Sequence, residues 1–470
     1  MVSTYAIPLD RGYASGNFGP DIPAGFWLGK NMIYREDGAL RCRHTYKIPS
    51  GNKCGPSGTN IIEAYPGGNI IAISSSGKAY YRDYNDGSYW NECTWTGSGG
   101  APLIGSGYRG FWGILNQTPV YTNRSDFPYL FTNNGTSFSY LAGGESGAFR
   151  CYFLNEHQNR LLLARVSSNG AMISYSDVDD INSGYTGNYV FAGESSEEIT
   201  GIHNLGGNMI ILREKSIWAK LGSYSKLTSD QFQPVARGIS SLCGSSASGR
   251  NSIYFADVSG IIAYSGGEQK KISTFSDKEW NTRSTSPGAP NPRLSYWHAK
   301  DWLWLTDGQS YEKPMVYDAV RGVWYRFTGF SPQCFTEYSG KLAFGMYGAA
   351  NCEYLFEYGI DTGETGAVES TILQELQTPF LNPGTPYGEK YLKNLLLDTS
   401  GVDKIEIYLR NNPSAPDDFP NNPQYTIYPD GDESRLYFDS SVKFREISIR
   451  LTGSGKMIIK SIAVQFEERR

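Results

Sequence analysis

Apolar runs of strand length recur along most of this chain, and turn residues separate them. Successive runs start roughly 40 to 50 residues apart, at Gly67, Tyr108, His157, Gly206, Arg250, Lys300 and Gly340. Each run is followed by a short polar gap and a second, aromatic-rich run, as in "MIILREKSIWAKLG". A hairpin repeated at this interval is typical of propeller blades with several strands each. The repeat predicts an all-β fold with an irregular β-propeller of about six to eight blades over residues 61–365.

The pattern changes on either side of the repeat. From about Ser370 onward, short segments alternate apolar and polar residues, as in "VDKIEIYLRNN", and Pro- and Asn-rich loops separate them. This alternation predicts a C-terminal β-sandwich platform domain over residues 366–470. Residues 1–60 are loop-rich and locally basic, and we expect them to form an N-terminal arm. In "STFSDKEWNTR", Ser276 and Glu279 have capping-box spacing, which predicts one short helix between blades.

Composition restricts the functional classes. Charged residues make up 19% of the chain and aromatic residues 14%, which favours a folded β protein over a disordered chain. The net charge of −5 argues against a surface that holds nucleic acid throughout, although DNA could still pass nearby. We expect no membrane insertion, because no stretch approaches the roughly 18 to 20 apolar residues of a spanning helix and the N-terminus lacks a secretory signal. The seven scattered cysteines contain no CxxC pair and predict reduced thiols.

Residues that could carry catalysis are sparse and poorly grouped. The four histidines, at positions 44, 157, 203 and 298, have no close pair, and no GxSxG motif supports a hydrolase triad. The acidic pairs Asp179-Asp180 and Glu197-Glu198 are expected in solvated turns rather than across a sugar. "YNDGSYW", residues 84–90, is close to the Asp-box of sialidase-type propellers, which is a structural turn. We therefore predict that the protein is not an enzyme and has no cofactor and no metal site.

The stretch "MVYDAVRGVWYRFTG", residues 315–329, could be a ligand site or a hairpin. Because the same pattern recurs in the other repeats, we interpret it as the second hairpin of a blade. Asp318 is expected to accept backbone N–H groups in the turn, and Gly322 to supply a positive φ angle. Trp324 is expected to pack between blades.

Basic residues cluster in the N-terminal arm and form the candidate contact site for an adaptor protein or DNA. They are Arg35, Arg41, Arg43 and Lys47. These side chains could touch phosphate, or they could dock the arm on an acidic neighbouring subunit. The interleaved Glu36 and Asp37 favour protein contact. No glycine loop that could cradle a phosphate precedes a helix, so nucleotide hydrolysis is not expected.

Several segments resemble the packaged-DNA stabilisation, or tail-nozzle, proteins of short-tailed bacteriophages. "EEITGIHNLGGNMIILREKSIWAKLG", "RGISSLCGSSASGRNSIYFADVSGIIAYSGGEQKKIST" and "DWLWLTDGQSYEKPMVYDAVRGVWYRFTG" look like successive blades of that family. "FREISIRLTGSGKMIIKSIAVQF" resembles its last strands, and "NMIYREDGALRCRHTYKIPSG" resembles its N-terminal segment. The resemblance implies a propeller joined to a sandwich platform, with copies arranged as a ring, commonly a hexamer. The early blades depart from the family in length and spacing, which leaves the blade count open.

The resemblance implies a structural virion protein made in the bacterial host cytoplasm. Its homo-hexameric tail nozzle would extend the channel of the portal and the tail adaptor, retain packaged DNA and conduct it during ejection. A needle, spike or fibre would dock below the ring. DNA would pass through the lumen without sequence-specific binding, and the net charge of −5 predicts that this lumen is weakly acidic. The alternative is a carbohydrate-binding or sialidase-like propeller, such as a phage receptor-binding protein. A secreted adhesin is a third reading, against which the missing signal peptide counts.

Overall fold

The computed structural model is built almost entirely of strands. It describes residues 2–13, 26–48, 54, 61–66, 69–82, 90–104, 110–142, 149–166, 169–273, 292–306, 314–338, 340–346, 354–360, 367–369, 371–384, 388–411, 422–429, 435–438 and 442–469. Short 3-10 helices, η1 (Asn133–Gly135) and η3 (Ser229–Gln231), lie between strands. The helix expected around Ser276 and Glu279 and the Asp-box-like residues 84–89 lie outside the described residues.

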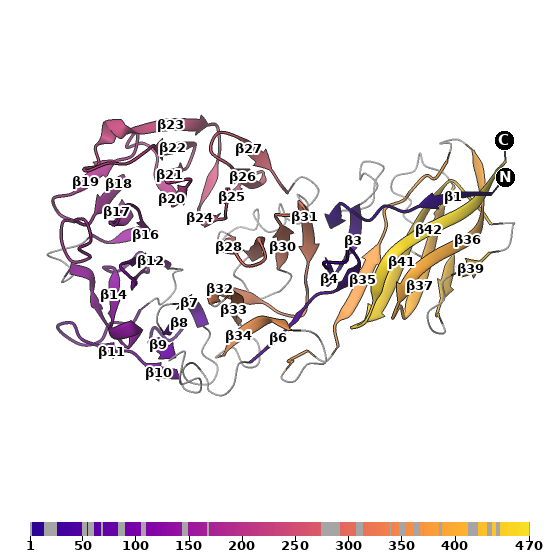
Figure 1. The fold of residues 1–470 in the computed structure, drawn as a ribbon, viewed down its shortest axis with the longest axis horizontal. Coiled ribbons are helices and arrows are strands. Elements are labelled where there is room, and N and C mark those ends of the chain that lie inside the picture. The colour runs from indigo at the N-terminus through magenta and orange to yellow at the C-terminus, as the bar shows by residue number, and fades with distance from the viewer. Residues whose placement is uncertain are drawn as a thin grey trace.

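In the described residues, seven sheets are arranged in a ring and form the blades of a β-propeller (Figure 1). Blade 1 comprises β7 (Ile61–Pro66), β8 (Ile70–Ser74), β9 (Ala79–Arg82) and β10 (Trp90–Glu92). Blade 2 comprises β12 (Phe111–Leu115), β13 (Thr118–Thr122), β14 (Tyr129–Thr132) and β15 (Ser137–Tyr140), with β11 (Thr94–Trp95) paired to β15. Blade 3 comprises β16 (Cys151–Glu156), β17 (Leu161–Val166), β18 (Asn169–Tyr175) and β19 (Tyr189–Phe191).

The remaining four blades follow the same order. Blade 4 comprises β20 (Ile199–Leu205), β21 (Asn208–Arg213), β22 (Ser216–Lys220) and β23 (Phe232–Arg237). Blade 5 comprises β24 (Ser241–Ser248), β25 (Ile253–Asp257), β26 (Gly260–Tyr264) and β27 (Gln269–Lys271). Blade 6 comprises β28 (Arg293–Trp297), β29 (Trp302–Thr306), β30 (Met315–Asp318) and β31 (Val323–Arg326). Blade 7 comprises β32 (Pro332–Tyr338), β33 (Lys341–Met346), β34 (Leu355–Ile360) and, from the N-terminal segment, β6 (Thr45–Lys47).

The second strand of each blade explains the recurring apolar runs of the sequence. Every residue of β8, β25 and β29 is buried. A strand that neighbouring blades cover on both faces needs apolar residues at every position, so it appears in the sequence as a continuous run. The count of seven blades lies within the range that the repeat predicts.

The propeller closes with a strand from the beginning of the chain. β6 pairs antiparallel with β34, with Lys47 opposite Glu357 and Tyr46 opposite Tyr358. The first strand of this blade, β32, contacts β7 of blade 1, which completes the ring of sheets. A closed ring leaves only short strand edges exposed, which limits unwanted edge pairing.

The second domain is a sandwich of two sheets. The first sheet has the order β39 (Arg435–Tyr437), β36 (Glu389–Ser400), β42 (Ile458–Arg469), β5 (Leu40–Cys42) and β4 (Met32–Tyr34), with β1 (Val2–Ala6) on β42 and β40 (Lys443–Phe444) on β36. The second has the order β2 (Gly12–Tyr13), β3 (Phe26–Lys30), β35 (Leu373–Gln377), β41 (Glu446–Ser454), β37 (Lys404–Arg410) and β38 (Tyr425–Ile427).

The segment expected to form an N-terminal arm is thus distributed over both domains. It supplies β1 to β5 to the sandwich and β6 to the propeller. Only Arg43 and His44 separate β5, in a sandwich sheet, from β6, in a blade. One hydrophobic core also continues across the junction, from Trp304 of blade 6 to Leu376 of the sandwich. The two domains therefore form one connected body (Figure 1).

The blade 6 hairpin places its three singled-out residues in structural positions. Asp318 is buried, and its Oδ1 accepts the backbone N–H groups of Val320 and Arg321 at 3.1 and 3.0 Å. Gly322 has a φ of 71° and donates its N–H to the Asp318 carbonyl at 2.7 Å. Trp324 donates its indole N–H to the Ile272 carbonyl, just after blade 5, at 2.7 Å. The turn, the positive φ and the contact between blades are all present.

We predict that Trp324→Ala lowers the free energy of unfolding by roughly 3 to 5 kcal/mol, since it leaves a cavity between blades 5 and 6. The Trp324 side chain is 5% exposed and its ring lies 5.2 Å from that of Tyr317. Chemical denaturation followed by circular dichroism measures the change. Val320→Ala, at a position 73% exposed in the same turn, is the matched control and should change stability by less than about 0.5 kcal/mol. Equal effects of the two substitutions would contradict the packing role.

Candidate functional site

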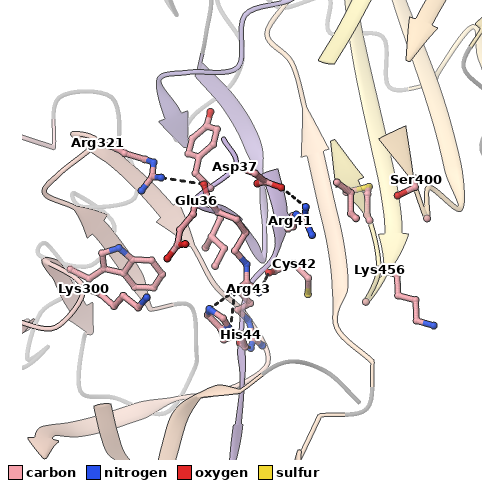
Figure 2. A pocket seen from close by; sticks show the side chains of 18 of the residues that line it. Glu36, Asp37, Arg41, Cys42, Arg43, His44, Lys300, Arg321, Ser400 and Lys456 are labelled. Carbon is pink, nitrogen blue, oxygen red and sulfur yellow. Dashed lines mark hydrogen bonds and ion pairs between the residues drawn. The ribbon is translucent and has the colours of Figure 1, made fainter. Parts of the chain in front are cut away.

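A large cavity lies among the described residues at the junction of the two domains. Its volume is about 1050 Å³. The hairpin between β4 and β5 lies in the middle, with turns of blade 6 on one side and turns of the sandwich on the other (Figure 2). The blade 6 turns supply Lys300 and Arg321, and the turn between β41 and β42 supplies Lys456. We call this cavity the junction cleft.

Arg43 forms the wall behind the cleft and is fully buried. Its guanidinium makes a two-pronged pair with Glu369, with both N–O distances at 2.8 Å. It also donates to the Asn31 side chain at 3.0 Å and to the Thr328 carbonyl at 2.7 Å. The guanidinium lies 4.8 Å from the centre of the Phe330 ring. Because its donors are used inside the chain, Arg43 offers no free surface to an adaptor or to DNA.

The other three predicted contact residues also have partners within the chain. Arg35 donates to the His44 ring and to the Cys42 carbonyl. Arg41 forms an ion pair with Asp37 across the β4–β5 turn. Lys47 lies 3.9 Å from the Glu357 carboxylate of blade 7. The structure brings Arg35, Arg41 and Arg43 to the cleft, and Lys47 points to the propeller instead.

The cleft carries an excess of positive charge although the chain is acidic overall. Arg41, Arg43 and Arg321 are each paired with a carboxylate, and the cleft residue Asp301 is paired with Arg250. Arg35 is engaged by the His44 ring and the Cys42 carbonyl, and the remaining charged groups of the described lining are Lys300 and Lys456 against Glu36. In the described part of the chain, no carboxylate forms an ion pair with Lys300 or Lys456. A negatively charged group is therefore the chemical match for this cleft.

Sequence reasoning did not find Lys300, Arg321 and Lys456 as a group. They lie in three turns, at the end of β28, between β30 and β31, and between β41 and β42. No spacing in the sequence links these turns, because the junction of the two domains brings them together. Their position next to hairpin turns was the only available signal.

The histidines and acidic pairs make structural contacts. His203 hydrogen-bonds with the hydroxyls of Ser248 and Ser246 at 2.9 and 2.8 Å, between blades 4 and 5. Burial lowers the pKa of His203 to about 4. Asp179 and Asp180 lie in an exposed turn, as expected. In the described residues, no three metal-ligating side chains are grouped, and no helix has the length and apolar character that crossing a membrane requires.

No protein-family model and no curated protein matches the sequence. Solved structures share the propeller fold. BamB from Moraxella catarrhalis is 9% identical with a TM-score of 0.38, over 65% of this chain and 84% of BamB. The WD40 β-propeller domain of Doa1 is 8% identical with a TM-score of 0.41, over 68% of this chain and 98% of that domain. YCF48 from Cyanidioschyzon merolae is 11% identical with a TM-score of 0.40, over 67% of this chain and 98% of YCF48. These likenesses concern the fold alone.

We predict that Arg43→Met lowers the free energy of unfolding by about 3 to 5 kcal/mol, because the Glu369 carboxylate loses its partner in a mostly buried site. The double substitution Arg43→Met with Glu369→Met should be less destabilising than the single one, since no unpaired charge remains. Arg41→Met, in an exposed pair, is the control and should cost less than about 1 kcal/mol. The denaturation midpoints of the native chain and of the three variants measure these changes in stability. Similar losses for Arg43→Met and Arg41→Met would contradict the junction role.

We predict that His203 makes folding sensitive to mild acid. The folded pKa of about 4 lies below the ordinary value of 6.5, so the unfolded chain binds more protons between these two values. The stabilisation that the neutral His203 ring gives the folded state is complete above pH 6.5 and is lost as pH falls towards 4. Between pH 7.5 and pH 5.5 the loss from this group should be about 1 kcal/mol. His203→Asn should remove that part of the pH dependence, and His298→Asn, with an exposed ring, should not. Unfolding curves at pH 7.5 and pH 5.5 give the free energy of unfolding at each pH. An equal loss of this free energy in His203→Asn and in the native chain would contradict the prediction.

Proposed function

We propose that this chain is a structural virion protein: one subunit of a ring-shaped tail nozzle of a short-tailed bacteriophage. The observation that carries the proposal is the close junction of its two domains, which share one hydrophobic core and a buried ion pair. The chain passes from a sandwich strand to a propeller strand within two residues, Arg43 and His44. The order of a propeller followed by a sandwich also agrees with what the family resemblance implies.

A nozzle subunit must transmit force without bending between its domains. Two connections cross the junction here, one from β5 to β6 and one from β34 to β35. The pair of Arg43 and Glu369 links these two connections, and the rings of Phe327 and Phe330, just after the last strand of blade 6, lie against the guanidinium. Domains joined by a small polar interface usually move relative to each other, whereas a shared core and a buried ion pair resist that motion. This construction suits a mechanical role.

The distribution of charge is compatible with a conduit for DNA. A wall that held phosphates tightly would slow passage of the genome, since each phosphate contact adds to affinity. In this chain Arg41, Arg43 and Lys47 of the N-terminal segment face carboxylates of the same chain. The net charge of −5 adds no general attraction for DNA. Both features support a lumen that DNA crosses without sequence-specific binding.

We expect purified protein to form rings that cap the portal–adaptor complex of the same virus. Negative-stain microscopy of the mixture should show end-on rings, commonly six-fold, and the portal without its adaptor is the control. Ring formation follows from a rigid subunit with two different complementary surfaces, because head-to-tail contacts close when the rotation between copies allows it.

The carbohydrate-binding alternative predicts a different outcome. A chain that stays monomeric with and without the portal–adaptor complex, and that binds or cleaves glycans, would contradict the nozzle proposal. A glycan array and a sialidase assay on the same preparation distinguish the two functions.

A further inference from the structure

The outer rim of blade 3 combines acidic and apolar side chains on the surface. Asp177, Asp179 and Asp180 lie in the turn that follows β18, and all three are exposed. Exposed apolar groups lie in the same turn and on the outermost strand β19: Val178 at 52%, Tyr189 at 50% and Phe191 at 37% exposure. An apolar patch with a charged border is typical of protein interfaces. In the described residues, no cation forms an ion pair with the three aspartates.

This acidic turn is held in one conformation. The Ser183 hydroxyl lies within hydrogen-bond distance of the carboxylates of both Asp177 and Asp180, at 3.0 and 2.8 Å, and its single hydrogen is shared between them. Asn188 donates to the other oxygen of Asp177 at 2.8 Å. The backbone N–H of Asp179 donates to the Asn159 carbonyl at 2.8 Å. Because the turn is already ordered, docking it would cost little conformational entropy.

The junction cleft has the complementary character. Lys300 and Lys456, against Glu36, leave its described lining with an excess of positive charge. Its lining includes the half-buried Tyr34 and Ile458, and Val320, beside Arg321, is 73% exposed. The cleft is thus basic and partly apolar, as the blade 3 rim is acidic and partly apolar.

We propose that the acidic turn of blade 3 in one copy docks in the junction cleft of the next copy. The inference rests on the proposed ring and identifies the contact that builds it. Blade 3 and the elements that border the cleft, β4 and blade 6, lie on opposite sides of the propeller (Figure 1), so the contact is head-to-tail. The β18–β19 turn and the β30–β31 turn join the third and fourth strands of their blades, which places both on one face of the propeller. Copies can therefore meet in a single layer.

A second copy fits the cleft better than nucleic acid does. Both the cleft and the blade 3 rim expose apolar surface, which favours a protein partner. The phosphate backbone of DNA would make no apolar contact with this surface. The contact pairs opposite charges at exposed positions, so it should weaken as ionic strength rises.

Cysteine cross-linking between two differently labelled copies tests the contact. Asp179→Cys in one copy and Lys300→Cys in the other, treated with a short bis-maleimide, should give a cross-linked dimer that contains both labels. Asp179→Cys mixed with Lys270→Cys, on the exposed edge of blade 5, is the control and should not. Of the native cysteines that the structure describes, five are buried and Cys243 is half-buried, so background should be low.

Charge reversal tests the same contact without new cysteines. Asp179→Lys or Lys300→Glu should each weaken self-association at least tenfold in sedimentation velocity. A mixture of the two single variants should restore assembly with alternating copies, because the reversed turn matches the reversed cleft and the native turn matches the native cleft. Rings that form normally from Asp179→Lys would overturn this contact and leave the nozzle proposal standing. Native chains that never form rings would instead contradict the nozzle proposal. Duplex DNA bound by the native chain and lost in Lys300→Glu/Lys456→Glu would also overturn the protein contact.

Discussion

The ion pair between Arg43 and Glu369 is the interaction on which the rest of the structure depends. Arg43 lies between a strand of the sandwich and a strand of the propeller, and Glu369 lies in the segment that returns from the propeller to the sandwich. The pair therefore joins the two places where the chain crosses between domains. The guanidinium also binds the Thr328 carbonyl, just after the last strand of blade 6. One side chain thus fixes blade 6, the closing strand of blade 7 and the start of the C-terminal domain.

A buried ion pair is an expensive way to join two domains, since both charges lose hydration. Apolar residues of similar size could fill this space with no such cost. A two-pronged arginine–carboxylate pair, however, also fixes direction, because the planar fork matches the carboxylate in only one arrangement. Rings of Phe327 and Phe330 lie within cation–π distance of the guanidinium and keep water away from it. We interpret the pair as a device that sets the angle between the domains.

The sequence predicted the propeller and the all-β class because each blade contains its own signal. A hairpin buried on both faces must repeat apolar runs, and the runs starting at Gly67 and Arg250 correspond to β8 and β25. The closing strand β6 could not be predicted, because three residues carry too little pattern and their partner β34 lies some 300 residues away. The basic cluster was recognisable, but its pairing was not: the partner of Arg43 is 326 positions distant. Local patterns predict elements, whereas a site at a domain junction depends on the fold.

The proposed ring gives the domain angle a functional meaning. In a head-to-tail ring, the number of copies depends on the rotation between the two contact surfaces of one subunit. One surface is the rim of blade 3, and the other is a cleft whose walls belong to different domains. The rotation is therefore determined jointly by the propeller and by the position of the sandwich against blade 6. A change at Arg43 that left the fold intact would alter the shape of the cleft, and with it the closure of the ring. The same buried pair would then control both the stability of the subunit and the geometry of its assembly.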